Sequence, residues 1–159
     1  ALALNHELQQ IILERDEIEH CLPALLTPTA RVELGQRLIG LAHSAIDISD
    51  GLMADLGHIL ESSGKAACIN MADIPCSTAL KKRLHQSLAM NCLLAGGDDY
   101  ELCFTAPKIN RGKIEALSAE LAIPLTLIGG ILSGEGLMVK DASGNAITLE
   151  TKGYDHFSA

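Results

Sequence analysis

Residues 44–52 read Ser44-Ala45-Ile46-Asp47-Ile48-Ser49-Asp50-Gly51-Leu52, and this stretch decides the fold. Its first half, residues 44–48, is a short apolar run with β-branched side chains and predicts a buried strand. From Leu52 to Leu60, apolar residues recur at helical spacing, and Gly64 is well placed to end that helix. Because Ser49-Asp50-Gly51 is typical of a turn, the stretch predicts a strand–turn–helix unit with polar side chains at its junction.

Outward from this unit, further segments alternate between helical and strand patterns. Helices are expected over roughly residues 4–20, over residues 32–42, around Leu80, Leu84 and Leu88 with Ser77 as cap, and after Asn110 as cap. Strands are expected at residues 66–70, 100–105, 125–128, 137–140 and 146–149. A loop containing Pro23, Thr27, Pro28 and Thr29 should follow the first helix. Strands interleaved with amphipathic helices indicate an α/β or α+β layered fold.

Length and charge narrow the class of protein. The 159 residues correspond to a single domain, with residues 1–30 as a lead-in helix and linker and residues 31–157 as the core. Twelve Lys and Arg against twenty Asp and Glu give a net charge of −8, so no nucleic-acid partner is expected. Uncharged stretches of about twelve residues are too short to span a membrane. No secretory signal opens the chain, and we expect a soluble, cytoplasmic protein.

Cysteine and histidine spacing does not suggest a structural metal site. The five cysteines are odd in number and none are spaced as C-x-x-C, and the six histidines show no close pairing. We expect the cysteines to be small buried apolar residues in a reducing compartment. Aromatic residues are rare, with two Tyr, two Phe and no Trp, so an aromatic beside a polar motif becomes a candidate for ligand contact.

The first candidate site is the junction at Asp47, Ser49 and Asp50. In a strand, Asp47 and Ser49 share one face, and Asp50 falls at a helix start, where backbone amides and the helix dipole favour an anion. Carboxylates beside such a helix start suit Mg²⁺ with a nucleotide, since Mg²⁺ prefers one or two carboxylates plus phosphate oxygens and water. The alternative is that Asp50 or Ser49 caps the helix, Gly51 fits the turn and Asp47 is solvated.

Two further segments could carry chemistry. In Gly96-Gly97-Asp98-Asp99-Tyr100-Glu101, the glycines allow a close approach to a ligand or a positive φ, and three acids concentrate negative charge. The alternative is an ordinary acidic turn before a strand. The tail Lys152-Gly153-Tyr154-Asp155-His156-Phe157 holds half of the aromatic residues. Its tyrosine could stack on a flat heterocycle, or it could pin the tail to the core.

Taken together, these segments resemble the thiamine-monophosphate kinase family, within the aminoimidazole-ribonucleotide-synthetase-like ATP-binding superfamily. The resemblance spans roughly residues 31–157. Its matching pieces are residues 44–52, Asp55-Leu56-Gly57-His58-Ile59, Gly96-Gly97-Asp98-Asp99-Tyr100-Glu101-Leu102 and Gly153-Tyr154-Asp155-His156-Phe157, with the Ile74-Pro75 turn and the Leu127-Ile128-Gly129 strand end. It implies a layered domain whose mixed β-sheet is packed by amphipathic helices.

The resemblance also implies an activity and residue roles. Members of the family transfer the γ-phosphoryl group of ATP to thiamine monophosphate, which gives thiamine diphosphate and ADP. By position, Asp47 and Asp50 resemble catalytic Mg²⁺ ligands, and Ser49 resembles a contact to ATP. Asp98 stands where the family usually has Glu in the substrate pocket, and a water could fill the gap that the shorter side chain leaves. Tyr154 stands where members carry Trp or Tyr against the thiamine.

The family has an N-terminal domain that supplies most Mg²⁺ ligands, the ATP phosphate contacts and the dimer interface, and nothing in this chain matches it. The resemblance therefore implies the C-terminal domain of a homodimeric kinase, inactive without its N-terminal domain. Two alternatives remain. One is another enzyme of the superfamily, an aminoimidazole ribonucleotide or selenophosphate synthetase, against which the tail at residues 153–157 argues. The other is a ligand-binding module without catalysis.

Overall fold

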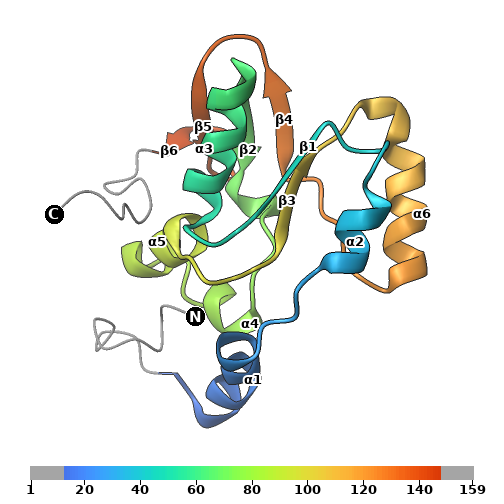
Figure 1. The fold of residues 1–159 in the computed structure, drawn as a ribbon. Helices are drawn as coiled ribbons and strands as arrows, with labels where there is room; N and C mark the ends of the chain where they lie inside the picture. Colours follow the sequence, from blue (N-terminus) through green and yellow to red (C-terminus); the bar gives the residue numbers. More distant parts are fainter. Residues whose placement is uncertain (1–12, 148–159) are drawn as a thin grey trace, which may run out of the picture.

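The computed structural model describes residues 13–147, which form two β-sheets with helices packed against them (Figure 1). The strands are β1 (Ser44–Asp47), β2 (Ala66–Asn70), β3 (Leu102–Thr105), β4 (Gly129–Leu132), β5 (Gly136–Lys140) and β6 (Ala146–Ile147). The helices are α1 (Arg15–Leu26), α2 (Val32–Arg37), α3 (Leu52–Ser63), α4 (Thr78–Lys81), α5 (Ser87–Ala95) and α6 (Arg111–Leu121), with short 3₁₀ turns η2 (Met71–Asp73) and η3 (Lys108–Asn110). No helix in this part of the chain is long and apolar enough to cross a membrane.

The larger sheet is mixed, as the resemblance implied. Its strand order is β4-β2-β5-β6, in which β2 runs parallel to β5 and antiparallel to β4, and β5 runs antiparallel to β6. The turn between β5 and β6 is closed by Asp141, whose Oδ1 accepts the backbone N–H groups of Ser143 and Asn145. The smaller sheet is the antiparallel pair β1–β3. The predicted layered α/β fold is confirmed.

Helix α3 lies over the larger sheet and forms the main core with it (Figure 1). Three leucines of one α3 face and two of α5 pack with the sheet residues Ile69 and Val139; these leucines are Leu52, Leu56, Leu60, Leu93 and Leu94. Each fully buried leucine contributes about 1.5–3 kcal/mol of hydrophobic stabilisation. A second, smaller cluster joins α2 to α6 through Leu34, Leu38 and Leu117. As predicted, Gly64 ends α3 in the left-handed conformation.

The first helix differs from the prediction of a helix over residues 4–20. Among the described residues it begins at Arg15, because Glu14 is its N-cap and forms a capping box with Glu17. The part of the prediction before residue 13 lies outside the described residues. The loop expected at Pro23, Thr27, Pro28 and Thr29 is confirmed for the last three residues, but α1 continues through Pro23 to Leu26. A proline inside a helix removes one backbone hydrogen bond, which α1 tolerates here.

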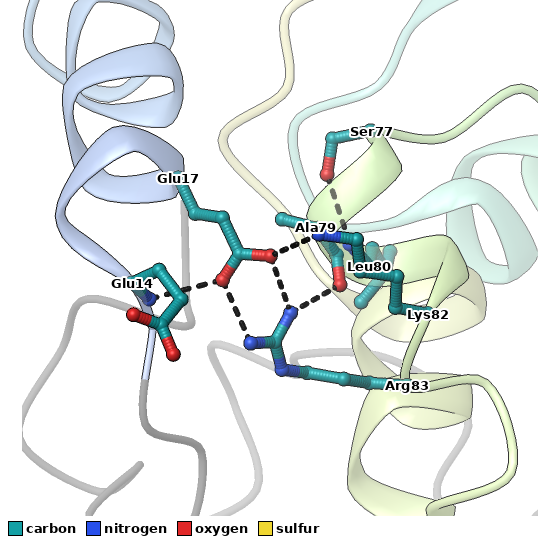
Figure 2. Close-up of polar contacts among 7 residues, drawn as sticks. All are labelled: Glu14, Glu17, Ser77, Ala79, Leu80, Lys82 and Arg83. Carbon is teal, nitrogen blue, oxygen red and sulfur yellow. Dashed lines mark hydrogen bonds and ion pairs between the residues drawn. The ribbon is translucent and has the colours of Figure 1, made fainter.

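A buried ion pair of Glu17 with Arg83 connects α1 to the segment that directly follows α4 (Figure 2). The Glu17 side chain is only 6% exposed, and its two carboxylate oxygens accept hydrogen bonds from Nη1 and Nη2 of Arg83 at 3.0 and 2.7 Å. Lys82 Nζ and the backbone N–H of Glu14 also donate to this carboxylate. Arg83 further donates to the Ala79 carbonyl oxygen. The pair therefore connects the first described helix to the body of the domain.

Two other predictions hold only in part. The single helix expected around Leu80, Leu84 and Leu88 is two helices, α4 and α5, separated by residues 82–86. Ser77 caps α4 as predicted, because its Oγ accepts the Leu80 N–H. Asn110 occupies the N-cap position of α6 without capping it; its Nδ2 donates to the Leu41 carbonyl oxygen instead.

The strand expected at residues 125–128 is displaced along the chain. The Ile128 carbonyl oxygen accepts the Asn70 N–H and the strand β4 begins at Gly129, whereas Ile123 and Leu125 pack on the α2–α6 cluster. Gly129 passes so close to β2 that a Cβ there would collide with the Cys68 carbonyl oxygen.

All five cysteines lie within the described residues as free thiols, and burial raises the pKa of Cys103 to about 11.

Candidate active site

The two acidic segments of the chain are joined by backbone hydrogen bonds that continue beyond the β1–β3 pair. Ile48 N–H donates to the Glu101 carbonyl oxygen, and Tyr100 N–H donates to the Ile48 carbonyl oxygen, each at 2.8 Å. Asp98 N–H donates to the Ser49 carbonyl oxygen at 2.9 Å. Segments about fifty residues apart in sequence therefore lie side by side at the junction between β1 and α3.

Glycines permit this close approach. A Cβ at Gly97 would collide with the Ser49 carbonyl oxygen, and a Cβ at Gly51 would lie 2.7 Å from the carbonyl carbon of Ala95. Gly51 also has φ 115°, which other residues rarely adopt. The expectation that Gly96 and Gly97 take a positive φ is wrong, since neither does. Their lack of a side chain serves contact with the chain's own backbone.

The positive φ angles fall on the residues after these glycines. Asp98 has φ 63° and Tyr100 has φ 51°, and they are two of the three non-glycine residues with positive φ among the described residues. The Tyr100 hydroxyl donates to Asp98 Oδ1 at 3.2 Å, and the Tyr100 side chain is 40% exposed. Such backbone conformations cost energy and cluster at functional sites. The loop is held in this shape by its hydrogen bonds to residues 48 and 49.

Three carboxylates act together on the Tyr100 phenol. Its pKa is raised chiefly by the hydrogen bond to Asp98 and by that residue's negative charge, and further by burial and by the charges of Asp47 and Asp50. The backbone hydrogen bonds of residues 48 and 49 with residues 98–101 place the Asp98 loop beside the segment that contains Asp47 and Asp50. Asp47 and Asp98 are exposed and Asp50 is half-buried. We call Asp47, Asp50 and Asp98 the acidic triad.

The helix start beside the triad is already occupied by a carboxylate. Asp55 Oδ2 accepts the backbone N–H groups of Ser49, Asp50 and Gly51, each at 3.1 Å. These three amides, which precede the first helical residue Leu52, are therefore not open to an outside anion. Burial raises the pKa of Asp55, while the three N–H groups lower it. Because Gly51 occupies the N-cap position of α3, the alternative in which Ser49 or Asp50 takes that position is also wrong.

The third acid of the Gly96–Glu101 segment has a structural partner. Arg31 Nε and Nη2 donate to the two carboxylate oxygens of Glu101 at 2.8 and 2.6 Å. This hydrogen-bonded pair raises the pKa of Arg31. Glu101 therefore ties the strand β3 to the start of α2, and its negative charge is compensated.

Sequence reasoning assigned no role to Asp55, Tyr100 or Arg31. The signal for Asp55 was its place four residues after Gly51, from which a side chain can reach back over the helix start. The signal for Tyr100 was the scarcity of aromatics in the chain. Tyr154 and the rest of the tail lie outside the described residues, so their predicted roles stay predictions.

The donor set of the triad fits Mg²⁺ chemically. Mg²⁺ takes oxygen ligands and is commonly held by one or two carboxylates, with phosphate oxygens and water completing its shell. Asp47 and Asp50 supply such oxygens beside the exposed Asp98. Within residues 13–147, no group of three or more acidic, histidine or cysteine side chains is arranged to hold a metal ion without help. A metal here would need further ligands from a bound phosphate or from water.

Comparison with curated proteins shows similarity to thiamine-monophosphate kinases. The chain is 41% identical over 157 residues to the enzyme of Escherichia coli (strain K12), a match that covers 98% of this chain and 47% of that protein. It is 43% identical over 136 residues to the enzyme of Haemophilus influenzae, covering 83% and 41%. The chain thus spans about half the length of these relatives. No family model matches it.

Solved structures agree with these relatives. The thiamine-monophosphate kinase of Stenotrophomonas maltophilia K279a superposes with a TM-score of 0.75 and 44% identity, over 86% of this chain and 42% of that one. AaThiL complexed with AMPPCP and TMP superposes with a TM-score of 0.70 and 31% identity, over 95% and 45%. Escherichia coli HypE, a hydrogenase maturation protein, shares the fold alone, with a TM-score of 0.61 and 19% identity.

Proposed function

We propose that this chain is the C-terminal domain of a thiamine-monophosphate kinase, which transfers the γ-phosphoryl group of ATP to thiamine monophosphate. The similarity to thiamine-monophosphate kinases over 98% of the chain supports this proposal. The observation that carries it is the backbone pairing of residues 48 and 49 with residues 98–101. That pairing gathers the acidic triad in one place, and the two segments it joins are those on which the resemblance depends.

Phosphoryl transfer needs little covalent chemistry from a protein, and depends on positioning and charge neutralisation. Asp47 and Asp50 would hold Mg²⁺, which supplies positive charge to the phosphates when it is bound. The backbone N–H of Ser49 is bound to Asp55 and its carbonyl oxygen to Asp98 N–H. Its hydroxyl is therefore the group that we assign to ATP. Asp98 would face thiamine monophosphate, with its carboxylate oriented by the Tyr100 hydroxyl.

The remaining parts of the active site would come from outside this chain. The chain spans 47% of the Escherichia coli relative, and we infer that an N-terminal domain provides most of the phosphate contacts and the interface of a homodimer. Tyr154 would form an aromatic wall against the thiamine. We infer a cytoplasmic location for the full-length protein.

Ligand-dependent thermal stabilisation of the full-length protein tests this assignment. Thiamine monophosphate, with Mg²⁺ and a non-hydrolysable ATP analogue, should raise Tm, because ligands that bind only the folded state stabilise it by mass action. Precursors of aminoimidazole ribonucleotide should leave Tm unchanged under the same conditions. Stabilisation by those precursors and not by thiamine monophosphate would overturn the proposal in favour of another enzyme of the superfamily.

A further inference from the structure

Asp55 is one of two buried charged residues among the described residues, and its carboxylate binds the backbone of the segment that contains Asp50. Its side chain is 2% exposed. It lies in the first turn of α3 and reaches back to the residues that precede this helix. One carboxylate oxygen, Oδ2, accepts three consecutive backbone N–H groups, those of residues 49, 50 and 51.

The carboxylate replaces an external anion. Backbone N–H groups at a helix start attract phosphate or carboxylate, because they are unpaired donors at the positive end of the helix dipole. Here the chain supplies the anion from its own helix. Hydrogen bonds to an ionised acceptor are stronger than neutral ones, so Asp55 holds the backbone of residues 49–51 in one conformation. Ser49 and Asp50 project from this fixed segment.

The opposite side of the segment is held independently. The Ser49 carbonyl oxygen accepts Asp98 N–H, and Gly97 packs against it without room for a side chain. The backbone at Ser49 is therefore fixed between the Asp55 carboxylate on one side and the Asp98 loop on the other. Loss of either contact would free the direction in which Asp50 and Ser49 point.

We propose that Asp55 is a positioning residue that orients the Asp50 carboxylate and the Ser49 hydroxyl, and that it excludes phosphate from the amides of residues 49–51. The consequence for catalysis rests on the proposed function, whereas the structural part does not. In this arrangement the phosphates of a nucleotide cannot use the backbone N–H groups of residues 49–51 as their anion site. They would meet this domain through the carboxylate-bound cation and the Ser49 hydroxyl.

Hydrogen exchange of the 159-residue chain, followed by NMR, tests the structural part. Asp55→Ala should speed exchange of the amides of residues 49–51 by about 10-fold or more, measured against the core amide of Ile69 in the same variant. Asp55→Asn keeps an oxygen acceptor without the charge, and should fall between wild type and Asp55→Ala. Ser77→Ala removes the α4 cap and is the matched control: it lowers stability without changing the ratio of the 49–51 amides to Ile69.

Inorganic phosphate serves as a probe of the vacated amides. In Asp55→Ala it should slow exchange at residues 49–51, and in wild type it should have no effect there. If Asp55→Ala does not fold, the same exchange measurements are made on Asp55→Asn. The proposal fails if the exchange ratio in the folded Asp55 variant equals that of Ser77→Ala, or if phosphate protects these amides in wild type.

Kinetics of the full-length protein test the catalytic part. Asp55→Asn should lower kcat by about 10-fold or more while KM for thiamine monophosphate stays within about threefold, because a misdirected group affects the transferring phosphate more than the bound thiamine. Ser77→Ala should leave both constants within about twofold. Equal effects of the two variants would reduce Asp55 to a structural role. An inactive wild-type protein would instead refute the proposed function and leave the exchange result standing.

Discussion

Substitution of Asp47 and Asp50 tests their assignment as Mg²⁺ ligands most directly. Asp47→Asn or Asp50→Asn in the full-length protein should lower kcat by about 100-fold or more, since a lost metal ligand costs several kcal/mol of transition-state stabilisation. Tm should change little, because Gly51 and not Asp50 occupies the N-cap position of α3. Steady-state kinetics and a melting curve on each variant measure both quantities. If kcat stays within about twofold of wild type for both variants, neither residue is a metal ligand.

Tyr154 carries the second prediction at the scale of single residues. A cation over an aromatic ring contributes about 0.5–2 kcal/mol, so Tyr154→Ala should raise KM for thiamine monophosphate by about 3–30-fold. KM for ATP should change much less. Tyr154→Phe keeps the ring face and should be mild. A variant that melts earlier than wild type with an unchanged KM would show instead that this tyrosine pins the tail.

At the scale of elements, the packing of the Gly97 loop against the β1–α3 junction predicts a strong effect of one added methyl group. Gly97→Ala should destabilise the chain by about 1–3 kcal/mol, because the new Cβ would collide with the Ser49 carbonyl oxygen. Gly57→Ala is the matched control. A Cβ at Gly57, inside α3, meets nothing within 4 Å, and this change should stabilise by about 0.5–1 kcal/mol. Urea unfolding of both variants tests the prediction, which a neutral Gly97→Ala would refute.

The buried ion pair of Glu17 with Arg83 predicts a pH dependence of stability. The hydrogen bonds from Arg83 and from the Glu14 backbone hold the pKa of Glu17 at about 2, below its ordinary value of 4.5. Since the folded-state pKa is lower than that of the unfolded chain, the contribution of Glu17 is complete above about pH 5 and is lost as pH falls towards 2. Glu17→Gln should therefore flatten the decline of the unfolding free energy over this range.

The exposed pair of Arg15 with Glu19 on the same helix offers the control for this measurement. Both of its side chains are largely in solvent, where such a pair contributes little. Glu19→Gln should accordingly leave the slope of unfolding free energy against pH unchanged. If the two variants show the same slope, the buried pair does not account for the acid sensitivity of the domain.

Local elements could be predicted from the sequence because their signals are local. The strand β1, the turn at residues 49–51, the helix α3 and its terminal Gly64 all follow from periodicity and turn chemistry within about twenty residues. The strand β2 and the Ser77 cap also match their predictions. The register of β1 against β3 could not be derived in this way, because it depends on contacts between segments far apart in sequence, from Ser44 with Thr105 to Asp47 with Leu102.

The errors have the same origin. Residues 125–128 carry a strand-like apolar pattern, yet Leu125 is used by the α2–α6 cluster, which no local pattern reveals. The acids of the candidate site were identified from motifs, but the Asp55 carboxylate that fills the helix start was not. That contact became visible only with the backbone path of residues 49–51.

At the scale of the whole molecule, charge sets what this chain can do alone. The chain has a net charge of −8, and under the proposed function a negatively charged nucleotide approaches the acidic triad. The Arg31 side chain near the loop is paired with Glu101. The electrostatic repulsion between these carboxylates and the phosphates of a nucleotide must therefore be offset by bound cations and by positive groups from outside the chain. We therefore assign activity to the full-length protein and not to this domain.

Formation of thiamine diphosphate from ATP and thiamine monophosphate, with Mg²⁺ present, tests this central claim most directly. The assay compares the purified full-length protein with the 159-residue chain at equal concentration. The account predicts steady product formation by the full-length protein, loss of it on removal of Mg²⁺, and no appreciable turnover by the chain alone, because positioning and neutralisation are then incomplete. Absence of product from the folded full-length protein, or steady turnover by the isolated chain, would contradict it.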